Sequence, residues 1–281
     1  MSVSPDNSLV NARDKELLSR AEYAPYVQTH HGECHSYCYR PSEDLASSEP
    51  RPAIVFFHGG LFDQRLPGQF APHCLHFASR GMVAFSVEYR VSNLYGTGPL
   101  QALEDARSFL SYITEHHTHY NIDPQKIVVG GSASGGYLAS HLCSRHKNNL
   151  NLIGELTQPC AQILYSPVVN TTHKGLCNLL FPDSKTAKRL SPSEQITKDY
   201  PPTMIFHGKV DKVVPFQHSK KYVKSLLRKK NKVELVEFEA ARHIDFNLNV
   251  NPQYYDLTLR SADYFLTDLG LVEPAPDLFL D

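Results

Sequence analysis

Residues 126–140 read KIVVGGSASGGYLAS, and this stretch decides the fold that the rest of the chain must fit. A short run of strand-forming residues enters a turn of glycine and serine, and small residues suited to the start of a helix follow. A phosphate-binding loop is the rival interpretation. It is disfavoured because the stretch has neither a lysine followed by serine or threonine nor the G-x-G-x-x-G spacing. The stretch therefore predicts a strand joined to a helix by one sharp turn.

Short apolar runs alternate with longer helical patterns on both sides of this turn. We expect strands at 54–57, 82–87, 127–129, 162–165, 203–206 and 233–238. We expect helices at 69–80, 99–116, 135–145, 216–229 and 253–269, with a short amphipathic helix at 7–22. Such alternation is typical of βαβ units, so we predict an α/β fold with a mostly parallel central sheet and helices on both faces.

The chain length and two irregular segments suggest how the chain is organised. A length of 281 residues fits a single domain, 1–281, with residues 1–50 as an N-terminal extension. Segment 170–202 is irregular and rich in proline, and it is too long for a simple connection. We therefore expect residues 170–202 to form a small cap insertion.

Composition gives no reason to expect nucleic acid or a membrane as a partner. Lysine plus arginine number 28 and aspartate plus glutamate 29, so nothing in the charge favours nucleic acid or an anionic membrane. The polar N-terminus carries no secretory signal pattern, and no apolar run approaches the roughly 18 residues of a membrane span. Six cysteines show no regular spacing. We expect a cytoplasmic protein with free thiols and no membrane span; nothing in the sequence indicates an oligomeric state.

The candidate chemistry lies where the predicted strands end, because the sites of open parallel sheets lie at the carboxyl ends of strands. His58-Gly59-Gly60 follows the first apolar run, and two glycines there allow backbone amides to turn toward a developing oxyanion. Asp211 and His243 follow the last two predicted strands. A carboxylate so placed can orient an imidazole. The order of the sharp turn, then aspartate, then histidine is that of a hydrolase triad.

The sharp turn has the build of a nucleophile elbow, G-x-S-x-G, but it lacks the central serine. Centring the pattern on Ala133 gives a full match except for the nucleophile itself. Centring it on Ser132 or Ser134 loses a flanking glycine in each case. An elbow points only its central side chain toward the site, so either neighbour could act only if the turn were rebuilt.

Taken together, these segments resemble the α/β-hydrolase esterase/lipase family, near its acetyl-esterase and hormone-sensitive-lipase-like branch. The resemblance runs from about Arg51 to Leu269 and is carried by IVFFHGG, LHFASRGMVAFSVEYR, NIDPQKIVVGGSASGGYLA, PPTMIFHGKVDKVVPF and ARHIDFN. The family elbow commonly reads G-x-S-A-G-G-H-L-A, and residues 131–139 align with it without a gap. The resemblance therefore places the family's serine at Ala133.

The resemblance implies a serine carboxylic-ester hydrolase that acts by acyl-enzyme transfer on a small-molecule ester with a small or medium acyl group. Asp211 and His243 would complete the triad, and the backbone amides of Gly59, Gly60 and Ser134 would form the oxyanion hole. No metal or cofactor is implied. Leu61 stands where the family usually has a third glycine.

Three explanations of Ala133 stay open. The chain is an engineered serine-to-alanine variant, or it is a naturally non-hydrolytic relative (ligand-binding or lyase-type), or Ser132 or Ser134 has taken over as nucleophile. Retention of Asp211 and His243 favours the first explanation, because a site that has lost its function has little reason to keep them.

Two further motifs have structural interpretations. Cys34 and Cys38, with the nearby histidines, invite a metal site, but residues four apart on a strand lie about 13 Å apart, too far for one tetrahedral ion. We therefore predict no metal site. Residues 88–90, Glu-Tyr-Arg, follow a central strand, and we expect them to form a buried polar network that supports the site.

Overall fold

The computed structural model describes residues 7–42, 49–144, 157–172 and 177–274. Its strands form one eight-stranded sheet with the order β1-β2-β4-β3-β5-β6-β7-β8. Their bounds are β1 Glu22–Thr29, β2 Gly32–Tyr39, β3 Arg51–Phe57, β4 Val83–Val87, β5 Ile122–Ser132, β6 Ala161–Tyr165, β7 Thr203–Gly208 and β8 Val233–Phe238. Strands β3 to β8 pair in parallel, whereas β1 with β2 and β2 with β4 pair antiparallel. The predicted, mostly parallel sheet is confirmed.

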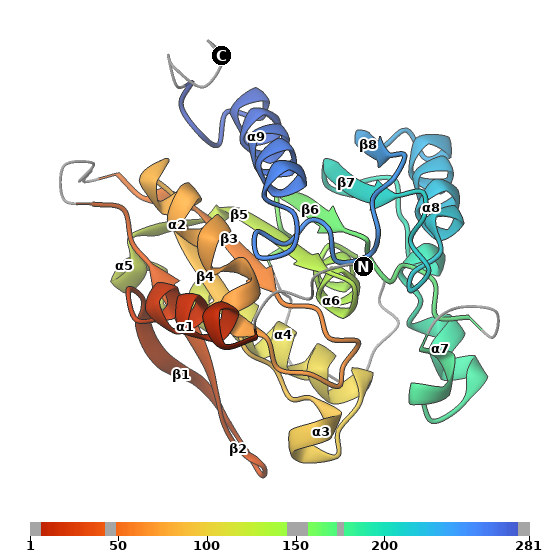
Figure 1. The fold of residues 1–281 in the computed structure, drawn as a ribbon, viewed down its shortest axis with the longest axis horizontal. Coiled ribbons are helices and arrows are strands. Elements are labelled where there is room, and N and C mark those ends of the chain that lie inside the picture. The colour runs from red at the N-terminus through yellow and green to blue at the C-terminus, as the bar shows by residue number, and fades with distance from the viewer. Residues whose placement is uncertain (1–6, 43–48, 145–156, 173–176, 275–281) are drawn as a thin grey trace.

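Helices cover both faces of this sheet (Figure 1). The α-helices are α1 Asn7–Leu18, α2 Ala71–Ser79, α3 Ser92–Tyr95, α4 Pro99–Glu115, α5 His117–Tyr120, α6 Ser134–Leu142, α7 Ser184–Arg189, α8 Phe216–Arg228 and α9 Pro252–Asp268. Short 3-10 helices are η2 Pro67–Phe70, η3 Asn178–Leu180 and η4 Pro192–Glu194. Each helix and each strand predicted from the apolar pattern has its counterpart here. The largest differences are β5, which begins at Ile122 and not at 127, and α1, which ends at Leu18 and not at 22.

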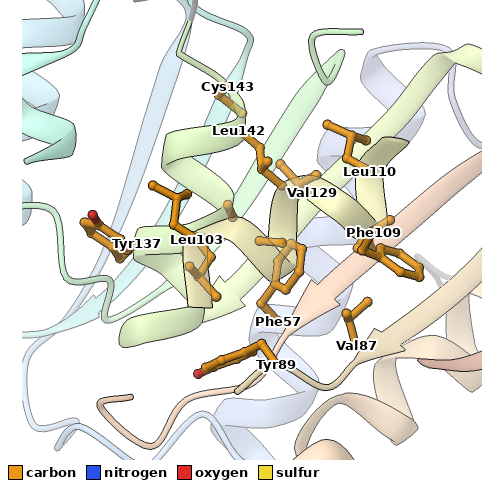
Figure 2. Packing of buried hydrophobic residues seen from close by; sticks show 14 of the residues in the cluster. Phe57, Val87, Tyr89, Leu103, Phe109, Leu110, Val129, Tyr137, Leu142 and Cys143 are labelled. Carbon is orange, nitrogen blue, oxygen red and sulfur yellow. The ribbon is translucent and has the colours of Figure 1, made fainter. Parts of the chain in front are cut away.

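Alternation along the central strands creates two cores. Val55 and Phe57 of β3 face the core covered by α4, α6 and α8, whereas Ile54 and Phe56 face the core covered by α2 and α9. Figure 2 shows the first core, where Phe57 packs among residues of α4 and α6. Because both faces are buried, the strands read as continuous apolar runs, which is why the sequence predicts them well.

Residues 22–39, part of the expected N-terminal extension 1–50, form a hairpin that the apolar pattern does not predict. Its strands β1 and β2 extend the sheet beyond β4. The alternating buried positions of β2 are the small residues Cys34, Ser36 and Cys38, and Tyr39 at its end is buried too. The strand therefore shows little apolar periodicity in the sequence. Among the described residues, there is no cluster of three or more His, Cys, Asp or Glu side chains that could hold a metal ion.

The segment expected as a cap, 170–202, contains η3, α7 and η4 over its described part. It packs against the end of α6, where His141 Nε2 lies 2.9 Å from the carbonyl oxygen of Leu190. None of the helices in the described ranges combines the length and apolar character needed to cross a bilayer.

Candidate active site

Ala133 lies at the centre of the turn between β5 and α6. Its φ of 48° and ψ of −111° fall in a backbone region that residues other than glycine rarely adopt. Two hydrogen bonds hold this conformation: the Ala133 amide donates to the Tyr165 carbonyl at 3.1 Å, and the Val168 amide donates to the Ala133 carbonyl at 3.0 Å. The turn therefore has the strained backbone of a nucleophile elbow with a methyl group at its centre.

The two glycines that flank this turn are required by close approach of the backbone. A Cβ atom on Gly131 would overlap the backbone of Gly135. A Cβ atom on Gly135 would overlap the carbonyl oxygen of Phe57 at the end of β3. The spacing of Gly131, Ala133 and Gly135 is thus explained by the contact between α6 and the end of β3.

Asp211 and His243 meet at the same edge of the sheet, after β7 and β8. His243 Nδ1 lies 2.8 Å from Asp211 Oδ2, and the Asp211 side chain is fully buried. The other carboxylate oxygen accepts the amides of Val213 at 2.8 Å and Val214 at 2.9 Å. The carboxylate is thereby fixed, and the histidine is held through Nδ1, which leaves Nε2 to face a reacting group.

A second histidine, which the sequence does not single out, contacts the same carboxylate. His207 Nε2 lies 3.3 Å from Asp211 Oδ2 and 2.9 Å from the Val214 carbonyl, and its side chain is fully buried. Burial alone would raise the pKa of Asp211, but hydrogen bonds from His207 and His243 hold it well below its usual range. Asp211 is therefore ionised whenever the protein is folded near neutral pH.

The loop after β3 contains the predicted oxyanion glycines. The Gly59 amide already donates to Gln69 Oε1 at 2.6 Å, so it is engaged within the protein. Gly60 has a φ of 100°, and no acceptor in the described part of the chain takes its amide hydrogen. Ser134 is the first residue of α6, where amides lack acceptors within the helix. Gly60 and Ser134 remain as the candidate donors, and Gln69 is a residue that the sequence does not reveal.

The two serines beside Ala133 have neighbours on the side of the β3 loop. Ser134 is fully buried and its Oγ lies 3.1 Å from the Tyr89 hydroxyl. Ser132 is 8% exposed and lies beside Gly59, on the side of the β3 loop. Within the described ranges, neither serine hydroxyl makes a hydrogen bond with His243.

Residues 88–90 are buried and make polar contacts, as predicted, but each has its own partners. Glu88 pairs with Arg65 Nη2 at 2.7 Å, and the Tyr89 hydroxyl bonds to the loop after β3. Arg90 donates two hydrogen bonds to the Asp105 carboxylate of α4, from Nε at 2.9 Å and from Nη2 at 2.7 Å.

Comparison with known proteins shows the family and the fold of the chain. The BD-FAE family model matches residues 39–226. The propionate-bound structure of Est2, a thermophilic esterase from Thermogutta terrifontis, superposes with a TM-score of 0.84 at 32% identity, covering 92% of this chain and 97% of that one. Endo-1,4-beta-xylanase B of Butyrivibrio fibrisolvens is 31% identical over 206 residues, 69% of this chain and 32% of that protein.

A probable carboxylic ester hydrolase of Mycobacterium tuberculosis, LipM, is 25% identical over 207 residues, 66% of this chain and 47% of that protein. The chain thus spans about a third to a half of the length of these curated relatives. The family match covers most of the chain, and the esterase superposes over nearly all of it. These likenesses show that the chain belongs to the BD-FAE family of α/β-hydrolase esterases and lipases.

Proposed function

We propose that this fold hydrolyses carboxylic esters of small or medium acids through an acyl-enzyme formed on a serine at position 133, and that the alanine standing there blocks this step. The observation that carries the proposal is the 2.8 Å contact between His243 and Asp211, at the same sheet edge as the strained turn at Ala133. The likeness to Est2, which is described with propionate or butyrate bound, supports small acyl groups.

The reaction follows from the positions of these groups. With serine at 133, Oγ attacks the ester carbonyl carbon while His243 Nε2 takes the hydroxyl proton. The bond between that carbon and the leaving alkoxide then breaks, and the alkoxide receives the proton from His243. Water repeats the sequence on the acyl-enzyme, which releases the acid. Asp211 holds the tautomer of His243 throughout, and the amides of Gly60 and Ser134 stabilise the oxyanion.

The chain as it stands has no hydroxyl at position 133, so it should bind esters without forming an acyl-enzyme. A naturally non-hydrolytic role, in ligand binding or lyase chemistry, is the second candidate function. It is favoured by Ala133 itself, while His243 remains as a base. Restoring a hydroxyl separates the two candidates, because only the first predicts that hydrolysis follows.

The test is Ala133→Ser, measured with nitrophenyl acetate, propionate and butyrate. Loss of a triad member commonly lowers the rate by about 10⁴ to 10⁶, so the gain should be of that order rather than a few-fold. The active variant should also be labelled once by paraoxon, the reagent that phosphorylates Est2. The relevant control is His243→Ala in the serine background, which should remove the gain. If the Ala133→Ser protein is folded but hydrolyses no ester of a broad panel, hydrolysis is refuted and the non-hydrolytic role becomes the leading candidate.

A further inference from the structure

We propose that Tyr89 and Ser134 form a hydrogen-bonded latch that positions the two amides of the oxyanion site. The latch joins the loop after β3, which carries the Gly60 amide, to the start of α6, which carries the Ser134 amide. Neither side chain touches the substrate, so both are positioning residues. This inference rests on the proposed function.

The contacts of the Tyr89 hydroxyl define the latch. Tyr89 Oη lies 2.9 Å from the His58 carbonyl oxygen, 3.2 Å from the Gly59 carbonyl oxygen and 3.1 Å from Ser134 Oγ. Tyr89 is 1% exposed and Ser134 is fully buried, so water does not compete for these bonds. In the described part of the chain, this hydroxyl is the side-chain group that bonds both to the β3 loop and to α6.

Hydrogen-bond chemistry gives the latch a direction. Carbonyl oxygens only accept, so the single hydrogen of the Tyr89 hydroxyl is donated to the carbonyls of the β3 loop. Ser134 must then donate its own hydroxyl hydrogen to Tyr89 Oη. Burial raises the pKa of Tyr89 well above its usual range, so the phenol keeps its hydrogen. The Ser134 hydroxyl is therefore committed to Tyr89 and is not free to act as a nucleophile.

The loop on the other side of the latch is held as firmly. The His58 ring stacks on the Tyr89 ring at a centroid distance of 4.2 Å. The Gly59 amide is tied to Gln69 Oε1. His58 Nδ1 lies 2.7 Å from the Gly59 carbonyl oxygen, so these contacts together fix the orientation of the peptide that precedes Gly60. The latch then sets the separation between the Gly60 amide and the Ser134 amide, and an oxyanion needs both at hydrogen-bond distance at once.

The test uses Tyr89→Phe in the Ala133→Ser background. This change keeps the ring that stacks on His58 and removes only the hydroxyl. We expect kcat to fall by about 10-fold, less than the roughly 10²-fold or greater loss of a complete oxyanion donor, because the donors are misaligned rather than absent. KM should change less than about two-fold, and the pH profile should keep its shape, since His243 and Asp211 are untouched.

Two further variants separate positioning from general stability. Ser134→Ala removes the other half of the latch, so its effect on kcat should not add to that of Tyr89→Phe in the double variant. Tyr222→Phe is the matched control, since its buried hydroxyl bonds to the Tyr200 hydroxyl at 2.8 Å and belongs to α8. It should lower stability without changing kcat. Equal kcat for Tyr89→Phe and its parent would overturn the latch.

A readout without catalysis distinguishes failure of the latch from failure of the proposed function. If Ala133→Ser is inactive, the function is wrong, and the latch is then tested in the chain as it stands. Amide hydrogen exchange, followed by mass spectrometry on the peptide spanning 58–62, should be about 10-fold faster or more in Tyr89→Phe, because the loop opens locally more often. Tyr222→Phe should leave it unchanged. Unchanged exchange in Tyr89→Phe refutes the latch whatever the activity.

Discussion

At position 133, the backbone keeps a conformation whose usual purpose is to present a hydroxyl group. Holding a residue other than glycine in such a region costs about 1–3 kcal/mol, which the surrounding structure must offset. Here the offset comes from the hydrogen bonds with Tyr165 and Val168 and from the packing of α6 onto β3. The alanine therefore occupies a strained turn, and under the proposed function a serine in this conformation would present its hydroxyl group to the site.

The glycines around this turn give a prediction about stability. Gly135→Ala should destabilise the protein by more than about 3 kcal/mol, or prevent folding, because the added methyl group would overlap the Phe57 carbonyl. Gly270→Ala is the control: its φ is 68°, but no atom lies within 4 Å of the added Cβ. It should cost only about 1 kcal/mol, from backbone strain. Urea denaturation measures both, and equal costs would contradict the packing argument.

Among the elements, the strands that the sequence predicts are β3 to β8, of which β3 to β7 are largely buried and β8 is a partly exposed edge strand. The missed hairpin, β1 and β2, lies at one end of the sheet, and β1 is one of its two edge strands. Its register shifts between Pro25 and Val27, and several of its residues are exposed. An edge strand does not need an apolar run, so its composition looks like that of a loop. The apolar pattern therefore finds the parallel strands β3 to β8 and misses the antiparallel hairpin at the other end of the sheet.

The same reasoning applies to the site. Asp211 and His243 follow strands that the pattern predicts, and their contact could be expected from strand order alone. Gln69 and His207 could not be found in this way, since their roles depend on which backbone group or carboxylate packs beside them. Gln69 lies in η2, ten residues beyond the glycine whose amide it binds. Such a contact cannot be predicted from the position of Gln69 in the sequence, because only tertiary packing creates it.

A buried ion pair joins two elements beside the site and gives a prediction at this scale. Asp105 of α4 binds Arg90, which follows β4, and both side chains are buried. Asp105→Ala should cost about 3 kcal/mol, since it leaves the buried Arg90 with the half-exposed Glu104, at 3.1 Å, as its remaining carboxylate partner. The double variant Arg90→Met with Asp105→Leu should recover most of that loss. The exposed pair Arg260–Asp256 is the control, and Asp256→Ala should cost less than about 1 kcal/mol by chemical denaturation. Similar losses at the two pairs would contradict this ranking.

Across the whole molecule, the two cores enclose histidines that the fold keeps neutral. Burial lowers the pKa of His58 to about 4, of His73 to about 3 and of His141 to about 4. In the unfolded chain, histidine titrates near about 6.5. Between about pH 6.5 and 4 the unfolded state therefore binds more protons than the folded state. The stability of the protein should be highest above that window and should fall as the pH is lowered through it.

His73 is the histidine at which this cost can be isolated. Both of its ring nitrogens are buried without a hydrogen-bond partner among the described residues, and its ring packs against those of Phe70 and Tyr255, each at 4.9 Å. His73→Phe fills the same space without polar atoms, so it should be at least as stable as the parent at pH 8. The stability advantage of the variant over the parent should be about 2 kcal/mol larger at pH 5 than at pH 8. At pH 5 the unfolded parent is stabilised because His73 takes up a proton, and the variant has no such group.

His141→Phe is the matched comparison, because His141 is also buried but its ring bonds to the Leu190 carbonyl. That variant should be less stable than the parent at pH 8, since it leaves a buried carbonyl unpaired, although its pH dependence should also be flatter. Thermal and urea denaturation at pH 8 and pH 5 measure both differences. Destabilisation of His73→Phe at pH 8 would show that the His73 ring makes a polar contact in the folded protein. An advantage that does not grow toward pH 5 would show that this histidine takes up its proton without unfolding.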